Sequence, residues 1–181
     1  EKAHARKALI TKLMWNPDAG LFFDYNVAWQ KQKTIKSLAS FIPLWVGLAD
    51  KTQASKVAAN LALFEHEYGL ATCDQDYGYS DRQWNYPYGW APLHWMVYHG
   101  LKGYGYQEAA YRIAEKWLML NAQVFKQTYL FWEKYDVVSG KAATIHDRYP
   151  AQHGFGWTNG VFLDLFWELR NKQISETESL A

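Results

Sequence analysis

Residues 83–95 hold the densest set of side chains suited to binding a small polar ligand. They include three tryptophans, two tyrosines, two amide side chains, one histidine and two prolines. The C–H faces of a sugar ring stack on aromatic rings, while its hydroxyls need fixed hydrogen-bond donors and acceptors. Each aromatic residue alone could belong to the core, but aromatic and amide groups at this density favour a carbohydrate-binding surface.

Glu133 is the carboxylate with the most unusual surroundings. It follows Phe131-Trp132, precedes Lys134-Tyr135-Asp136 and lies outside any amphipathic helical pattern. Burial among aromatic rings penalises the charged form of a carboxylate, so a Glu held there needs a charged partner. Such a group can act as a general base on a water molecule. The alternative is a solvated Glu133–Lys134 pair at the surface, and the local sequence does not decide between the two.

Other chemistries have little support. Asp24 lies between aromatic residues and could be a site carboxylate, or it could bond to local backbone N–H groups. Asp74 and Asp76 form a D-x-D pair, which is weak evidence for a metal and favours a solvated loop. His94 and His99 lack the i, i+4 spacing of a helical zinc pair, and there is no nucleophile elbow or phosphate loop. We therefore predict no metal and no cofactor.

The composition of the chain narrows the classes of function that it could have. The chain has 181 residues, enough for one domain or part of one, and ten tryptophans, which is an unusual number. A net charge of +1 without a basic run gives no case for a nucleic-acid partner, and no apolar run is long enough to predict a membrane span. Cys73 is the single cysteine, so the redox compartment and the localisation stay open. The chain starts in helical rhythm without Met, so we expect it to be a piece of something longer.

Two kinds of helical pattern alternate along the chain. Largely apolar segments at 37–48, 92–103 and 158–170 alternate with amphipathic ones at 1–14, 51–64 and 106–124. Pro43 predicts that the first apolar helix starts near it or kinks, and Pro92 predicts the start of the second. Apolar inner helices covered by amphipathic outer ones are typical of an α/α toroid of helical hairpins. Because no strand pattern competes, the predicted fold class is all-α, with six helices forming about half of a twelve-helix ring.

In such a toroid, the candidate functional residues should lie at one end of the ring of helices. Polar-aromatic loops at 77–91, 129–136 and 146–158 precede or connect the inner helices, so we expect them to gather around a central cavity. Trp84, Trp90 and Trp157 should then lie around one cavity within reach of Glu133. We also expect the inner helices to be the more buried set, an open apolar face where the ring is incomplete, and a polar tail over 171–181.

Three ordered motifs resemble those of the trehalases, glycoside hydrolase family 37. Residues 83–92, Q-W-N-Y-P-Y-G-W-A-P, resemble the signature Q-W-D-x-P-x-G-W-x-P; residues 133–135 match E-K-Y; and residues 154–160 match G-F-G-W-T-N-G. The resemblance implies an (α/α)6 barrel, with residues 1–170 as its C-terminal part, and inverting hydrolysis of α,α-trehalose to two glucoses. It implies that Glu133 is the catalytic base. It also implies sugar-binding roles for the remaining motif residues, Gln83, Trp84, Asn85, Trp90, Phe155, Trp157 and Asn159.

The chain also departs from that family in three places. No segment matches the part of the barrel that carries the general-acid Asp, so the missing N-terminal part of the same barrel is an expected partner. Asn85 replaces the Asp of the signature. Arg148 stands where the family places a glucose-binding Glu, and a guanidinium donates hydrogen bonds where a carboxylate accepts them. These departures leave open two alternatives, an α/α-barrel glycosidase acting on another glucoside or a mannoside, and a catalytically inactive sugar-binding relative.

Overall fold

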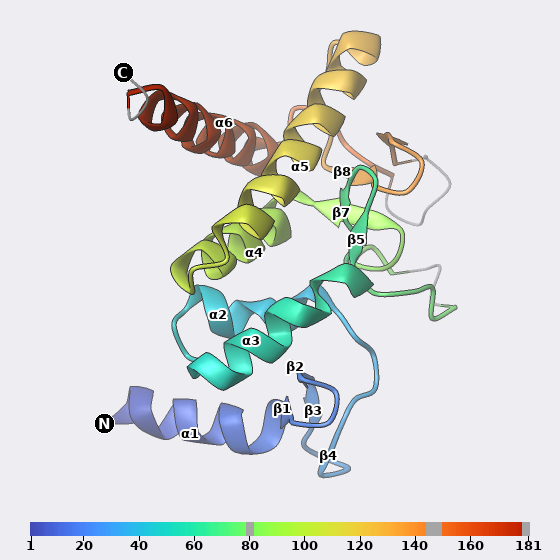
Figure 1. Cartoon of the computed structure of the whole chain (residues 1–181). Coiled ribbons are helices and arrows are strands. Elements are labelled where there is room, and N and C mark those ends of the chain that lie inside the picture. Colours follow the sequence, from blue (N-terminus) through green and yellow to red (C-terminus); the bar gives the residue numbers. More distant parts are fainter. Residues whose placement is uncertain (79–81, 144–149, 179–181) are drawn as a thin grey trace.

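Helices make up most of the computed structural model, which describes residues 1–78, 82–143 and 150–178 (Figure 1). The described residues form six α-helices: α1 (Lys2–Met14), α2 (Ile42–Trp45), α3 (Lys51–Ala59), α4 (Ala91–Gly103), α5 (Gln107–Thr128) and α6 (Gly156–Glu178). A 3-10 turn, η1 (Leu38–Phe41), leads into α2, and a second, η2 (Asn60–Leu63), extends α3. The predicted all-α class and the order of the helices are confirmed.

Prolines set the starts of the two apolar helices, as predicted. Pro92 is the second residue of α4 and Pro43 the second residue of α2, positions where the missing N–H costs no helical hydrogen bond. The helical segment predicted over 37–48 starts beside Pro43, as one of the two expectations had it, but it is shorter than predicted. It is a 3-10 turn followed by a single α-helical turn, because Pro43 has no N–H with which to extend an α-helix back over the preceding turn.

The other helices begin and end for local reasons. Asp50 and Gln53 form a capping box at the start of α3, in which the backbone N–H of each residue donates to the side chain of the other, at 3.0 and 2.8 Å. The helix α5 runs to Thr128, beyond the predicted end at 124, and Tyr129 then adopts a left-handed conformation. The buried face of α5 repeats every three or four residues, which confirms its amphipathic pattern.

The core is centred on α4, which packs against α2, α5 and α6. Its buried face includes Leu93, Val97, Tyr98 and Leu101. Gly100 lets α2 approach closely, since a Cβ at this position would lie only 3.0 Å from the backbone nitrogen of Trp45. The helix α4 is therefore an inner helix in the sense that the apolar pattern predicted.

The helix α6 departs from its prediction. Leu165 is buried, but Leu163, Phe166 and Trp167 are 56%, 42% and 51% exposed, so the expected burial of residues 158–170 is wrong for this structure. These side chains instead form the open apolar face predicted for an incomplete ring. The helix also continues past 170 to Glu178, where we expected a polar tail. Ser175 is one of the polar residues that this extension accommodates, by bonding back to the carbonyl of Asn171.

Short strands, which the sequence did not predict, connect the helices. The described residues contain three two-stranded hairpins: β1–β2 (Trp15–Asn16, Leu21–Phe22), β3–β4 (Tyr25–Asn26, Lys31–Gln32) and β5–β6 (Glu65–His66, Gly69–Leu70). A three-stranded antiparallel sheet orders β7 (Tyr88–Trp90), β8 (Lys134–Asp136) and β9 (Lys141–Ala142). Strands of two or three residues are too short to show a period-two pattern, so the sequence could not predict them. The strands labelled in Figure 1 lie in two groups, β1 to β4 beyond the end of α1 and β5, β7 and β8 beside α5.

Candidate active site

Backbone pairing brings the three polar-aromatic loops together in their described parts. The strand β7 from the first loop pairs with β8 from the second, with Trp90 opposite Lys134. Trp132 of the second loop forms a β-bridge with His153 of the third, and the Glu133 N–H donates to the Gln152 carbonyl at 2.7 Å. The prediction that these loops gather at one end of the helices is confirmed for these segments.

Glu133 and Lys134 are buried side by side. Only 8% of Glu133 is exposed and none of Lys134, and the Lys134 Nζ lies 3.9 Å from the Glu133 Oε2. The same Nζ lies 5.3 Å from the centre of the Trp90 ring and 5.7 Å from that of Tyr88. The alternative of a solvated surface pair is therefore wrong. The ammonium of Lys134 supplies the charged partner that a carboxylate among aromatic rings requires.

Two hydroxyl groups fix the backbone just before Glu133. The Trp132 N–H donates to the Tyr135 hydroxyl at 2.9 Å, and the Thr158 hydroxyl donates to the Trp132 carbonyl at 2.8 Å. Tyr135 is fully buried, and this burial raises its pKa to about 12, so the hydroxyl stays protonated at neutral pH. Thr158, a buried residue in the first turn of α6, ties that helix to the backbone just before Glu133. Sequence reasoning missed this role, and its only signal was the position of Thr158 within the third motif.

The three tryptophans form one cluster. The rings of Trp84 and Trp90 are stacked with centroids 4.0 Å apart at 10°, and Trp157 lies 6.1 and 5.9 Å from them, nearly perpendicular to both. Trp84 and Trp157 are 42% and 37% exposed, whereas Trp90 is completely buried. The structure thus brings the three predicted residues together, but Trp90 supports Trp84 from behind and presents no face to solvent.

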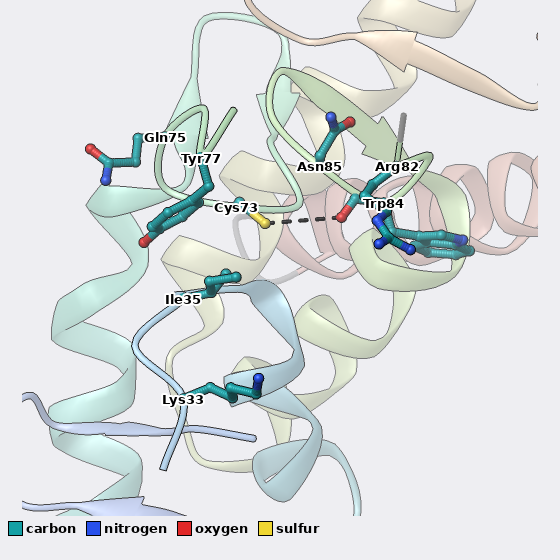
Figure 2. Close-up of a pocket in the computed structure, with 8 residues that line it drawn as sticks. All are labelled: Lys33, Ile35, Cys73, Gln75, Tyr77, Arg82, Trp84 and Asn85. Atoms are coloured by element: carbon teal, nitrogen blue, oxygen red, sulfur yellow. Dashed lines mark hydrogen bonds between the residues drawn. The ribbon is translucent and has the colours of Figure 1, made fainter. Parts of the chain in front are cut away.

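A cavity of about 330 Å³ opens beside Trp84 (Figure 2). Of the predicted site residues, Trp84 and Asn85 line it. The rest of its wall comes from positions that we did not predict as site residues: Lys33, Ile35, Cys73, Gln75, Tyr77 and Arg82. The Cys73 thiol is 4.0 Å from the Trp84 carbonyl, and burial raises its pKa to about 11, so the thiol is protonated and unreactive at neutral pH. This wall joins segments far apart in sequence, which no local pattern could reveal.

The remaining predicted residues lie around the cluster or outside the described part. The ring of Phe155 is 4.8 Å from that of Trp157 and its carbonyl accepts the Asn159 N–H at 3.3 Å. Asn159 itself is exposed in the first turn of α6, and Gln83 is half-buried beside Trp84 in the chain. Arg148 lies outside the described residues.

His94 holds the loop that carries Trp90. The Leu70 N–H donates to its Nε2 at 2.8 Å, so the proton is on Nδ1, which lies 2.9 Å from the Trp90 carbonyl. Burial lowers the pKa of His94 to about 4, which leaves the ring neutral at pH 7. Gly89 makes room for this arrangement, since a Cβ there would lie 3.0 Å from the imidazole ring.

The two acidic residues considered for metal binding, Asp74 and Asp76, have other partners. Asp74 pairs with Lys36 at 3.8 Å and accepts the Tyr77 hydroxyl at 2.7 Å, while Asp76 caps a turn at Gly78. Asp24 is exposed, and its backbone carbonyl accepts a hydrogen bond from the following segment. The described residues contain no group of three or more side chains placed to hold a metal ion, and none of the described helices is long and apolar enough to cross a membrane.

Helical hairpins with a buried carboxylate and a tryptophan cluster at their loop end define part of an α/α toroid of the glycosidase class. The chain belongs to the trehalase family, whose family model, Trehalase, matches residues 1–169. It is 35% identical to the cytosolic neutral trehalase of Saccharomyces cerevisiae, over 90% of this chain and 24% of that protein. It is 36% identical to the periplasmic trehalase of Pseudomonas aeruginosa, over 91% of this chain and 30% of that protein. The chain thus spans about a quarter to a third of the length of these two curated relatives.

Solved structures agree with this assignment. The neutral trehalase Nth1 from Saccharomyces cerevisiae superimposes with a TM-score of 0.74 at 35% identity, over 90% of this chain and 29% of that one. The GH63 mannosylglycerate hydrolase from Thermus thermophilus, in its complex with glucose, gives a TM-score of 0.71 at 26% identity, over 90% and 38% of the two chains.

Proposed function

We propose that the protein containing this chain is an inverting trehalase, which hydrolyses α,α-trehalose to two glucoses. In this proposal, residues 1–170 form the C-terminal part of an (α/α)6 barrel, residues 171–181 are a polar extension, and the chain supplies the base side of the site. The observation that carries the proposal is Glu133, which is 8% exposed beside a buried ammonium at the tryptophan-lined end of the helices. Membership of the trehalase family supports the substrate.

Inversion divides the chemistry between two carboxyl groups. Glu133 takes a proton from a water molecule as that water attacks the anomeric carbon. A carboxylic acid from outside this chain protonates the leaving oxygen on the opposite face of the sugar, at a separation of about 6.5–9.5 Å from the base. Lys134 compensates the buried charge of Glu133, and the bonds to the Trp132 backbone fix the main chain from which the Glu133 side chain extends.

The sugar contacts divide between exposed and supporting groups. The exposed rings of Trp84 and Trp157 stack on the sugar, while Trp90 and Phe155 support them from behind. Gln83, Asn85 and Asn159 bond to the hydroxyl groups, and Arg148 completes the set of donors.

The test is Glu133→Gln in the intact protein, which keeps size and hydrogen bonding but cannot accept the proton. General-base catalysis contributes about 10²–10⁴-fold, so kcat should fall by at least a hundredfold while trehalose binding persists. Glu115→Gln, which changes an exposed residue of α5, is the matched control and should retain full turnover. The inverting mechanism is tested separately on the wild-type protein. NMR of the sugars that it has freshly released from trehalose should show α- and β-glucose in equal amounts. Near-normal turnover of Glu133→Gln would make Glu133 a structural residue.

A second candidate is hydrolysis of another glucoside or of a mannoside. It is favoured by the similarity to the Thermus thermophilus mannosylglycerate hydrolase and by Arg148 at the place of a glucose-binding Glu. A substrate screen of the intact protein separates the candidates, because trehalose should be the best substrate only in the first. Sugar binding without turnover of any substrate would indicate a catalytically inactive relative.

A further inference from the structure

The ammonium of Lys134 lies beside both parts of the candidate site. Its Nζ is 3.9 Å from the Glu133 Oε2 and 5.3 Å from the centre of the Trp90 ring. The strand register explains the second contact. Trp90 on β7 is opposite Lys134 on β8, and opposite residues of an antiparallel pair project from the same face of the sheet. One buried cation therefore contacts both the proposed base and the buried ring of the tryptophan cluster.

The Trp90 ring is not oriented by a hydrogen bond within the described part of the chain. Its Nε1 is buried and has no hydrogen-bond acceptor among the described residues, although the N–H of a buried tryptophan usually has one. The ring orientation therefore depends on the groups that pack against it. An ammonium within about 6 Å of an indole ring is attracted to it, and the attraction is stronger when both groups are desolvated. Lys134 and Trp90 are both completely buried, so they meet this condition.

The Trp84 ring depends on Trp90 in turn. The two rings are stacked with centroids 4.0 Å apart at 10°, so a rotation of Trp90 would either move Trp84 or break the stack. Trp84 is the exposed member of this Trp84–Trp90 stack, and its ring is one of those proposed to stack on the sugar. The contacts thus run from Lys134 to Trp90 and from Trp90 to Trp84.

We propose that Lys134 is a positioning residue that orients the exposed ring of Trp84 by holding Trp90, in addition to pairing with Glu133. The inference rests on the proposed function for the position of the sugar. It makes one buried cation responsible for the placement of both the base and the sugar-stacking ring. Substitution of Lys134 should therefore weaken sugar binding even when Glu133 carries no charge.

The intact protein carrying Glu133→Gln separates this role from charge compensation. In this parent variant, Lys134→Met leaves no Glu133 charge without its partner. Lys134→Met should nevertheless weaken trehalose binding, followed by tryptophan fluorescence, by about 3- to 30-fold, as expected for the loss of one desolvated cation–π contact. Lys134→Arg keeps a cation that can lie over an aromatic ring and should restore most of the affinity.

Circular dichroism follows the Trp84–Trp90 stack without any ligand. Indole rings this close couple their ultraviolet transitions, so the difference between the spectra of the parent and of Trp84→Phe defines the signal of the stack. Lys134→Met should lose most of this signal, and Lys134→Arg should keep it. Trp90→Phe weakens the same contact from the other side, because phenylalanine attracts a cation less than tryptophan does. Adding Lys134→Met to Trp90→Phe should therefore reduce the affinity for trehalose no further.

Lys102 provides a matched control. It pairs with Glu168 and lies 5.8 Å from the centre of the Tyr98 ring, the same two kinds of contact, but in the last turn of α4. Lys102→Met should leave the affinity and the stack signal of the parent unchanged. An unchanged affinity or an unchanged stack signal in Lys134→Met, or equal effects of Lys134→Met and Lys102→Met, would overturn the inference. Loss of the stack signal in Lys134→Met, in a parent that does not bind trehalose, would support the inference and count against the proposed function.

Discussion

His94 should make the stability of this fold sensitive to acid. The ring is completely buried and neutral, it bonds β6 to the Trp90 carbonyl, and it stacks on Trp117 with centroids 4.0 Å apart. Its pKa falls from 6.5 to about 4 because burial penalises the imidazolium. The unfolded chain therefore binds a proton more readily than the folded one.

The size of this pH effect on the free energy of unfolding follows from the linkage between protonation and folding. A group whose pKa is lowered by folding contributes its full stability above its unfolded value, and loses it as the pH falls from about 6.5 towards about 4. Between pH 7 and pH 5, this histidine should lower the free energy of unfolding by about 2 kcal/mol. The whole shift corresponds to about 3 kcal/mol, which is an upper bound approached only below pH 4.

Urea unfolding of the intact protein at several pH values measures this effect. His94→Gln keeps a donor and an acceptor but cannot titrate, so it should be less stable at pH 7 and lose less stability on acidification. The difference in unfolding free energy between wild type and His94→Gln should therefore be about 2 kcal/mol smaller at pH 5 than at pH 7. His4→Gln, at an exposed position on α1, should keep the wild-type pH dependence. If the unfolding free energy of His94→Gln falls as steeply as that of wild type, the buried histidine is not the cause.

Two further substitutions test the supports of the site. Gly89→Ala would place a Cβ 2.4 Å from a Val137 methyl group and 2.9 Å from a backbone oxygen. The free energy of unfolding in urea should therefore fall by about 3 kcal/mol. Gly103→Ala is the control, because a Cβ there meets nothing within 4 Å, and it should be near neutral in the same assay. Thr158→Val removes the donor to the Trp132 carbonyl and should lower the free energy of unfolding by about 1–3 kcal/mol. If this bond positions Glu133, the same substitution should lower kcat and leave KM unchanged. A rise in KM at unchanged kcat would argue against that positioning role.

Local patterns were sufficient to predict most of the helices. The apolar period and the two prolines predicted the starts of α2 and α4 to within a few residues, because helix initiation at a proline is decided by the adjacent backbone. They also predicted the helix α6 but not the exposure of its Leu163, Phe166 and Trp167 side chains. Periodicity reports which face of a helix is apolar, and burial depends on whether another element covers that face.

The site was predictable only as far as its motifs extend. The motifs pointed to Glu133 and to the three tryptophans, and the structure brings their loops together through β7 and β8. They could not show that Trp90 is buried beneath Trp84, because the two rings occupy one loop and only its folded path decides which ring faces solvent.

The supporting residues depend entirely on distant contacts. His94 bonds across 24 positions to Leu70, and Thr158 across 26 positions to Trp132, so no local periodicity could reveal either bond. Lys33 reaches the cavity from a hairpin far before the Cys73 segment that forms the opposite wall. A carboxylate and a set of aromatic rings can therefore indicate the chemistry from sequence. Their rigidity arises from residues that sequence patterns treat as ordinary, and the substitutions at His94 and Thr158 measure those contributions directly.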